Sequence, residues 1–94
     1  MKITVIEGPD SGAERSLESP GTYLIGRSAD CELRLSDPET SRRHAAITLA
    51  PGRAIVDDQT SRNGTRVNEI RVQHAMLKDG DVIRLGGTHI QVDG

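Results

Sequence analysis

Hydrophobic and polar residues alternate with a period of two at several places along the chain. Near its start, Ile3 and Val5 alternate with Lys2 and Thr4, as the two faces of a half-buried β-strand require. Similar short runs recur at regular spacing and are bounded by Gly, Pro or Asp. The strands that this pattern predicts cover residues 2–5, 16–18, 22–25, 32–35, 45–49, 54–56, 82–85 and 88–92. Many short strands separated by turn residues predict an all-β sandwich or barrel.

The turn residues between these runs carry their own predictions. Gly86-Gly87 predicts a two-residue hairpin, because glycine tolerates the positive φ that such turns require. Asp37-Pro38-Glu39 resembles a helix start, with an N-cap followed by proline at the first helical position. No amphipathic run follows it, so we expect at most one helical turn there. No internal repeat or low-complexity linker interrupts the pattern.

Length and composition limit the architecture further. The chain has 94 residues, so we expect residues 1–94 to form a single domain, either on its own or as a module of a larger protein. Hydrophobic residues make up 34%, without Trp or Phe, so the core must consist of Ile, Val, Leu and Ala with Tyr23 as the one aromatic residue. Cys31 is the only cysteine, which excludes an intrachain disulfide and a Cys-rich zinc site. No signal-peptide or membrane-helix pattern is visible, so we expect a cytoplasmic protein without membrane insertion.

Three loops between the expected strands concentrate cationic and hydroxyl side chains. They cover residues 26–28, 41–44 and 60–66, and none of them contains Asp or Glu, in a chain whose net charge is −2. Their arginines are Arg27, Arg42, Arg43, Arg62 and Arg66. The planar guanidinium group suits phosphate oxygens, and Ser and Thr hydroxyls can donate to the same oxygens. The amide of Asn63 can hold an extended peptide backbone. The loops therefore indicate an anion site beside a peptide clamp, and a set of solvated turn residues is the alternative.

The order and spacing of three short motifs resemble the forkhead-associated (FHA) domain family. The motifs are Gly26-Arg27, Ser41-x-x-His44 and Asn63-Gly64. Residues 58–65 resemble the family's loop before its Asn-Gly pair, and residues 77–86 resemble its closing hairpin. The resemblance extends from about residue 23 to residue 92, and the Ser-Arg-Arg-His-Ala run is similar to bacterial members. The family reads phosphorylated motifs with arginine clusters.

This resemblance implies both a fold and a function. The fold is an FHA/SMAD-like β-sandwich of two antiparallel sheets, with about eleven strands and the binding loops at one end. The function is recognition of phosphothreonine in a protein or peptide that a Ser/Thr kinase has modified, without catalytic activity. The implied phosphate contacts are Arg27, Ser41, Arg42, Ser61 and Arg62; the implied contact to the peptide backbone is Asn63; and the residues that hold the loops in shape are Gly26, His44 and Gly64.

Two details of the loops qualify this interpretation. Consecutive residues of an extended chain point in opposite directions, so we expect Arg42 to face the ligand and Arg43 to pack or to face solvent. The turn after Val67 is Asn68-Glu69, where the family often has Asn-Gly. That difference changes the expected turn type and leaves the predicted contacts untouched.

Other classes of function fit the residues less well. Ser41, His44 and Asp58 invite a hydrolase-triad interpretation, but the chain lacks a nucleophile elbow and is too short to enclose a reaction pocket. The three histidines have no metal-ligand spacing, and no Walker-type run is present. We therefore expect no metal, no cofactor and no enzymatic activity.

Binding alternatives also differ in their support. Nucleic-acid binding is disfavoured because the basic patch is small, the net charge is negative and no aromatic stacking platform exists. The main alternative is a phosphate-independent interaction module, because the resembled family includes members that bind partners without phosphate. We expect the isolated domain to be monomeric.

Overall fold

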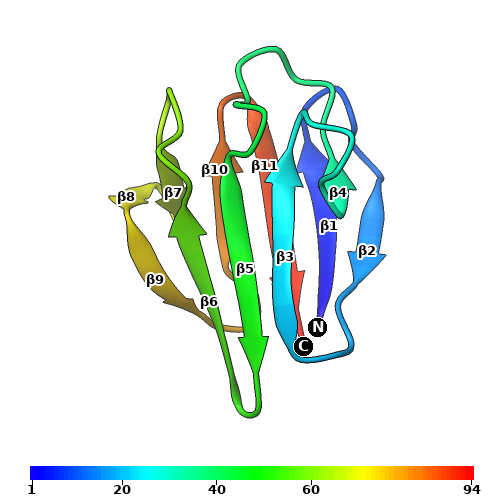
Figure 1. Ribbon diagram of the computed structural model, residues 1–94, viewed down its shortest axis with the longest axis vertical. Helices are drawn as coiled ribbons and strands as arrows, with labels where there is room; N and C mark the ends of the chain where they lie inside the picture. The colour runs from blue at the N-terminus through cyan, green and yellow to red at the C-terminus, as the bar shows by residue number, and fades with distance from the viewer.

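The computed structural model describes all 94 residues and consists of eleven strands without a helix (Figure 1). The strands are β1 (Lys2–Glu7), β2 (Glu14–Ser16), β3 (Gly21–Gly26), β4 (Leu33–Arg34), β5 (Ala45–Ala50), β6 (Arg53–Asp58), β7 (Thr65–Val67), β8 (Ile70–Val72), β9 (His74–Leu77), β10 (Val82–Leu85) and β11 (Thr88–Asp93). The all-β class and the strand number implied by the resemblance are confirmed. The structure contains no helix that is long and apolar enough to cross a membrane.

The strands form two sheets that pack face to face as a sandwich (Figure 1). One sheet has six strands in the order β2-β1-β11-β10-β7-β8, and the other has five in the order β4-β3-β5-β6-β9. All neighbours are antiparallel except β3 and β4, which pair in parallel with Ile25 opposite Leu33. The expectation of two antiparallel sheets is therefore confirmed except for this short edge pair.

The core lies between the sheets and is almost entirely aliphatic. A cluster of 16 buried residues fills it, with Ile47 from the five-stranded sheet and Ile83 and Ile90 from the six-stranded sheet fully buried. Burial of each such side chain stabilises the fold by about 1.5–3 kcal/mol. Tyr23 is half-buried at the margin of this core, and its hydroxyl donates to the Ser19 carbonyl at 2.5 Å. A core of this kind agrees with a composition that has no Trp or Phe.

Some predicted strands are shifted or shortened. The strand expected at 16–18 is Glu14–Ser16, because Leu17 turns inward and its N–H donates to the Met1 carbonyl outside the ladder. The strand expected at 32–35 is only Leu33–Arg34. The alternation did not predict β7, β8 and β9, because these strands have only three or four residues each and carry several charged or histidine side chains.

The predicted helical turn at Asp37-Pro38-Glu39 is wrong, because these residues form a β-turn. The Asp37 carboxylate accepts the Glu39 N–H at 2.9 Å, and the Asp37 carbonyl accepts the Thr40 N–H at 3.0 Å. Asp and Asn side chains commonly bond the backbone two residues ahead in turns as well as at helix starts. The local signal was therefore genuine, but it belonged to a turn.

Two tight turns have the backbone geometry that their pairing requires. The Gly86-Gly87 hairpin is confirmed, with Leu85 paired to Thr88 and a φ of +60° at Gly86. In the β7–β8 turn, Asn68 and Glu69 have φ values of +50° and +70°. A turn with positive φ at both central residues is the type that an Asn-Gly pair would form. The expected change of turn type is therefore wrong: Asn68-Glu69 keeps the turn type of Asn-Gly, and Glu69 accepts backbone strain.

The two ends of the sandwich differ in their connections. At one end lie the longer loops that follow β3, precede β5 and follow β6, together with the Gly86-Gly87 hairpin between β10 and β11. We call this the loop end. At the opposite end lie both chain termini and the short turn at Pro51-Gly52 (Figure 1). All three arginine-bearing loops noted in the sequence are at the loop end.

Candidate functional site

Gly26 and Arg27 bring two loops of the loop end into direct backbone contact. The Arg27 N–H donates to the Ser41 carbonyl at 3.1 Å, and the Ser28 N–H donates to the Arg42 carbonyl at 2.9 Å. Gly26 is buried, and a Cβ atom placed on it would overlap the backbone carbonyls of Ser41 and Arg42. Only glycine permits this close approach of the two loops.

The Arg27 side chain is exposed and only partly engaged. Its Nε–H donates to the Thr40 carbonyl at 2.5 Å, which fixes the direction of the guanidinium group. Its two terminal nitrogens donate to no group of the protein. Four N–H bonds in one plane therefore remain available to an anion.

Ser41 presents a hydroxyl group that has accepted one hydrogen bond and donated none. The Arg62 N–H donates to Ser41 Oγ at 3.0 Å, which links the second and third loops. Because Oγ is the acceptor in this bond, its own proton is free to be donated to a ligand. The guanidinium group of Arg62 is exposed and makes no hydrogen bond within the protein.

His44 is fully buried beneath the same two loops and joins them. The Ser41 N–H donates to His44 Nδ1 at 3.0 Å, and Nε2 lies 2.8 Å from the Gly64 carbonyl. Because Nδ1 accepts a backbone hydrogen bond, the ring proton must be on Nε2 and is donated to Gly64. The histidine is therefore a two-sided brace between the loops that carry Ser41 and Asn63.

Asp58 holds the third loop from inside. Its carboxylate accepts hydrogen bonds from the Ser61 hydroxyl, from the Ser61 N–H at 3.0 Å and from the Thr65 hydroxyl at 2.7 Å. Burial raises the pKa of Asp58, but the Ser61 and Thr65 hydrogen bonds outweigh it and hold the pKa below its usual value. Ser61 Oγ also accepts the Gly64 N–H at 3.0 Å.

A third brace, Asp37, ties the loop before β5 to the β10–β11 hairpin. Its carboxylate accepts the Gly87 N–H at 2.8 Å and the Thr88 hydroxyl at 2.9 Å, in addition to the Glu39 N–H. Burial raises the pKa of Asp37, but the hydrogen bonds from Glu39, Thr88 and Gly87 outweigh it and lower the pKa. Asp37 is 4% exposed, so it acts through the loop and not by contact with a ligand.

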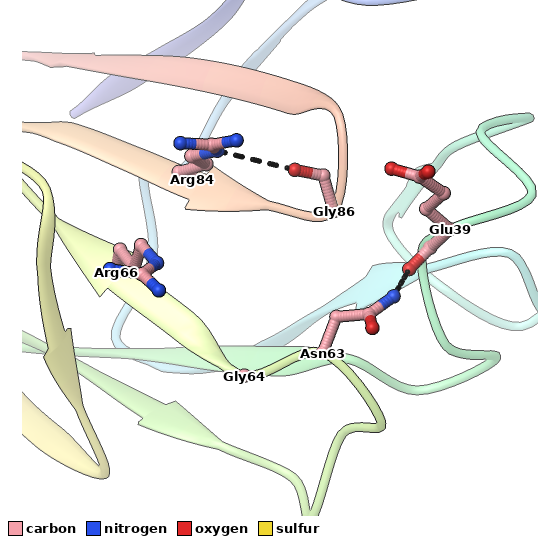
Figure 2. A pocket seen from close by; sticks show the side chains of 6 residues that line it. All are labelled: Glu39, Asn63, Gly64, Arg66, Arg84 and Gly86. Atoms are coloured by element: carbon pink, nitrogen blue, oxygen red, sulfur yellow. Dashed lines mark hydrogen bonds between the residues drawn. The ribbon is translucent and has the colours of Figure 1, made fainter.

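Asn63 stands at the centre of the loop end. Its Nδ2 donates to the Glu39 carbonyl at 2.6 Å, as Figure 2 shows, which leaves Oδ1 and one N–H unused. The next residue, Gly64, has a φ of +81°, a conformation that side-chain-bearing residues resist. The exposed amide can therefore offer one donor and one acceptor to a peptide backbone.

Two adjoining pockets lie on either side of Asn63. The first has a volume of about 260 Å³ and is lined by Arg27, Pro38, Glu39, Thr40, Ser41, Arg62 and Asn63. The second has a volume of about 240 Å³ and is lined by Glu39, Asn63, Gly64, Arg66, Arg84 and Gly86 (Figure 2). The structure thus brings four of the residues predicted to contact a ligand, namely Arg27, Ser41, Arg62 and Asn63, around one pocket.

The other predicted contacts lie outside that pocket. The single Ser61 proton is donated to Asp58, so its hydroxyl has no donor left for a phosphate. Arg42 is exposed but lines neither pocket. Arg43 Nη2 lies 2.5 Å from Asp30, so Arg43 faces away from the pocket. Arg42 and Arg43 form a turn and not an extended segment, so the alternation from which we expected their directions does not apply. The hydrogen bond from Ser28 and the one from Arg43 lower the pKa of Asp30.

Sequence reasoning gave Asp37, Asp58 and Gly86 no supporting role in the site, and it counted Thr65 only among the hydroxyls of the third loop. A Cβ on Gly86 would overlap the Glu39 backbone, so Gly86 admits the loop before β5. One signal could have indicated the two aspartates: each lies a few residues before a basic loop in the sequence. An acid that is buried there needs hydrogen-bond donors, and the neighbouring loop supplies them. No group of three or more His, Cys, Asp or Glu side chains is arranged to hold a metal ion.

These features together define a class of protein. A β-sandwich whose loops converge at one end and present guanidinium, hydroxyl and amide donors is an all-β recognition domain with anion-binding loops.

Comparisons with known proteins then identify the family. The FHA domain family model matches residues 23–86. FhaA, an FHA domain-containing protein of Mycobacterium tuberculosis, is 44% identical over 84 residues, which is 88% of this chain and 16% of FhaA. The chain belongs to the FHA domain family, and it spans only a small part of the length of this curated relative.

Solved structures agree with this assignment. The crystal structure of the FhaA FHA domain complexed with the intracellular domain of Rv3910 has a TM-score of 0.87 and 40% identity, and covers 96% of each chain. A structure from an analysis of phosphothreonine-dependent FHA domain interactions has a TM-score of 0.89 and 40% identity, covering 100% of this chain and 97% of the other.

Proposed function

We propose that this FHA domain binds phosphothreonine peptides at the loop end and so mediates phosphorylation-dependent protein interaction. The observation that carries the proposal is the unused donor set around one pocket: the two terminal nitrogens of Arg27, the Ser41 hydroxyl proton and the Arg62 guanidinium. Phosphothreonine offers nearly two negative charges and three acceptor oxygens at neutral pH. A solved structure with 40% identity to this chain comes from an analysis of phosphothreonine-dependent FHA domain interactions, which supports the same ligand here.

The proposed roles follow from the donors that remain free. Arg27 and Ser41 bind the phosphate, each with charge-assisted hydrogen bonds of about 1.5–3 kcal/mol net. Arg62 adds charge at the pocket rim, and Asn63 holds the ligand's main chain. Arg42 contributes longer-range attraction from outside the pocket. Ser61 supports the phosphate site through the loop, because its proton is engaged by Asp58.

The expected affinity is micromolar, on the order of −8 kcal/mol, since ordering a flexible peptide offsets part of the contact energy. Phosphothreonine should bind more tightly than phosphoserine. Its extra methyl group is buried against the loops, which adds about 0.8 kcal/mol to the free energy of binding. That difference corresponds to about a fourfold preference.

The wider setting is also proposed. One 16-residue core serves both sheets, which supports residues 1–94 as a single FHA unit. We propose that this unit recognises and does not catalyse, and that it acts in the cytoplasm, where Ser/Thr kinases have ATP with which to make phosphothreonine. The partner would be a protein or peptide that such a kinase has modified.

The test is a titration with a degenerate phosphothreonine peptide library, beside the same library unphosphorylated and with phosphoserine. Binding restricted to the phosphothreonine pool, and at least about tenfold weaker after Arg27→Ala, would support the proposal. The matched control is Arg53→Ala, at the opposite end of the sandwich, which should bind as the wild type does. Equal binding of the phosphorylated and unphosphorylated pools would instead identify a phosphate-independent interaction module.

A further inference from the structure

A row of cationic side chains crosses the outer face of the six-stranded sheet. Arg84 on β10 pairs directly with Arg66 on β7, and Arg66 pairs with Arg71 on β8. Directly opposite residues of antiparallel strands point to the same face, with Cβ atoms about 4.5–5.5 Å apart. Arg66 and Arg84 alternate with buried neighbours, so they face outward. We call Arg66, Arg71 and Arg84 the arginine row.

The charges of the arginine row are not balanced within the protein. Only Arg84 has a carboxylate partner, Glu69, at 3.1 Å. Arg66 donates to the Glu69 carbonyl at 3.3 Å and forms no ion pair, and Arg71 forms neither an ion pair nor a side-chain hydrogen bond. Like charges directly opposite one another destabilise a sheet. An anion placed over the row would relieve this repulsion.

The arginine row adjoins the proposed peptide clamp. In Figure 2, Arg66 and Arg84 lie on one side of the second pocket, with Asn63 and Glu39 on the other. Arg71 also reaches this region, because a Cβ atom on Gly64 would lie 2.8 Å from Arg71 Nε. The row therefore begins where a peptide held by Asn63 would leave the loops.

We infer that the arginine row binds an acidic tract of the phosphorylated partner, an inference that rests on the proposed function. Arg66 is three residues beyond Asn63, at most about 10 Å along the chain, and Arg84 and Arg71 lie one strand spacing of about 4.8 Å to either side of it. An extended peptide advances about 3.3 Å per residue, so the tract lies about three to four residues from the ligand residue that Asn63 holds.

The chemistry of the surface favours a carboxylate-rich peptide. Glu39 faces the pocket from the loop side and repels carboxylates there, which directs them toward the arginines. A nucleic acid fits less well, because the net charge is −2 and the only aromatic residue, Tyr23, is half-buried in the five-stranded sheet.

The experiment compares phosphothreonine peptides that carry either a run of Glu or a run of Gln, placed before or after the phosphothreonine. By calorimetry in low salt, the wild type should bind one Glu peptide about tenfold more tightly than its Gln counterpart, and high salt should reduce the gain to less than about twofold. In the double variant Arg66→Gln/Arg71→Gln, which keeps the Arg84–Glu69 pair, the gain should disappear while binding of the Gln peptide stays unchanged.

The matched control is Arg53→Gln/Lys78→Gln, which removes the same charge at the opposite end and should keep the gain. If the wild type binds Glu and Gln peptides equally, or if the gain survives in the double variant, the inference about the arginine row is overturned. The proposed function is then unaffected. Binding of single-stranded DNA that depends on Arg66 and Arg71, without any gain for Glu peptides, overturns it as well. Failure of every phosphothreonine peptide to bind overturns the proposed function, and the inference with it.

Discussion

The loop end and the opposite end of the sandwich are stabilised in different ways. At the loop end, long connections are held by buried polar side chains, His44 and Asp37 among them, that bond backbone groups of other loops. At the opposite end, Gly52 turns the chain with a φ of +75° and has open space around its Cβ position. There, Asp81 is the one buried acid, and it braces only its own turn and the β7–β8 turn.

This difference bears on binding. A loop that is already held in its bound conformation does not have to be ordered by the ligand, so less of the interaction energy is lost. We expect changes in the braces to affect stability and affinity together, and changes at the opposite end to affect stability alone. Four experiments test this contrast, from the largest expected effect to the smallest.

His44→Ala should lower the free energy of unfolding by about 4 kcal/mol, because it leaves the buried Ser41 N–H and Gly64 carbonyl without partners. Phosphopeptide affinity should fall in parallel, since both loops lose their common support. Urea unfolding followed by circular dichroism and calorimetry measure the two effects. His44→Asn, whose amide oxygen can replace Nδ1 as acceptor, should recover part of both. An Ala variant with wild-type stability would show that His44 is no brace.

Gly26→Ala and Gly52→Ala compare the two ends directly. At Gly26 the added methyl group meets the backbone of Ser41 and Arg42, so we expect a loss of about 3 kcal/mol and at least about tenfold weaker binding. At Gly52 the methyl group meets nothing, and the positive φ alone costs about 1 kcal/mol. Binding should be unchanged there. Equal effects on affinity at the two positions would remove the distinction between the ends.

Asp37→Asn should destabilise the protein by about 2 kcal/mol at neutral pH and flatten its acid response. The pKa of Asp37 is lowered by folding, so its contribution is present above the unfolded pKa of about 3.9 and is lost as pH falls through the folded pKa. Stability measured between about pH 7 and pH 2 should therefore fall less steeply in the variant than in the wild type. Asp58 contributes a fall of the same sign, so the variant keeps a residual slope. Parallel curves would contradict the assignment.

Glu69→Gly should stabilise the protein, by about 1 kcal/mol, because glycine accepts the φ of +70° without strain. The exposed ion pair with Arg84 is lost, which offsets only a few tenths of a kcal/mol. Thermal unfolding measures the gain, and affinity for a phosphothreonine peptide without acidic residues should not change. A lower melting temperature would show that the turn is not strained.

The braces also show where prediction from sequence ended. The motifs Gly26-Arg27 and Asn63-Gly64 indicated the site, and the structure places both around one loop end. Ser61 stood in the right loop, but its proton is donated inward to Asp58, which no local pattern indicates. The bond between Asp37 and Glu39 is local, and the sequence indicated it, although as a helix start. The bonds from Gly87 and Thr88 to Asp37 join residues about half the chain apart, and no local pattern indicates them.

By itself, the sequence determined the properties that depend on neighbouring residues. Alternation with period two specified most strands, the Gly86-Gly87 pair specified its hairpin, and a composition without Trp or Phe specified an aliphatic core. The ordered motifs specified the family.

Only the tertiary structure decided which distant groups meet. The His44 brace joins residues 20 positions apart, and the arginine row exists only because β10, β7 and β8 pair in one register. Shifting a strand by one residue would turn each of these side chains to the other face. Such contacts depend on the packing of the whole sandwich, and local sequence patterns do not specify that packing.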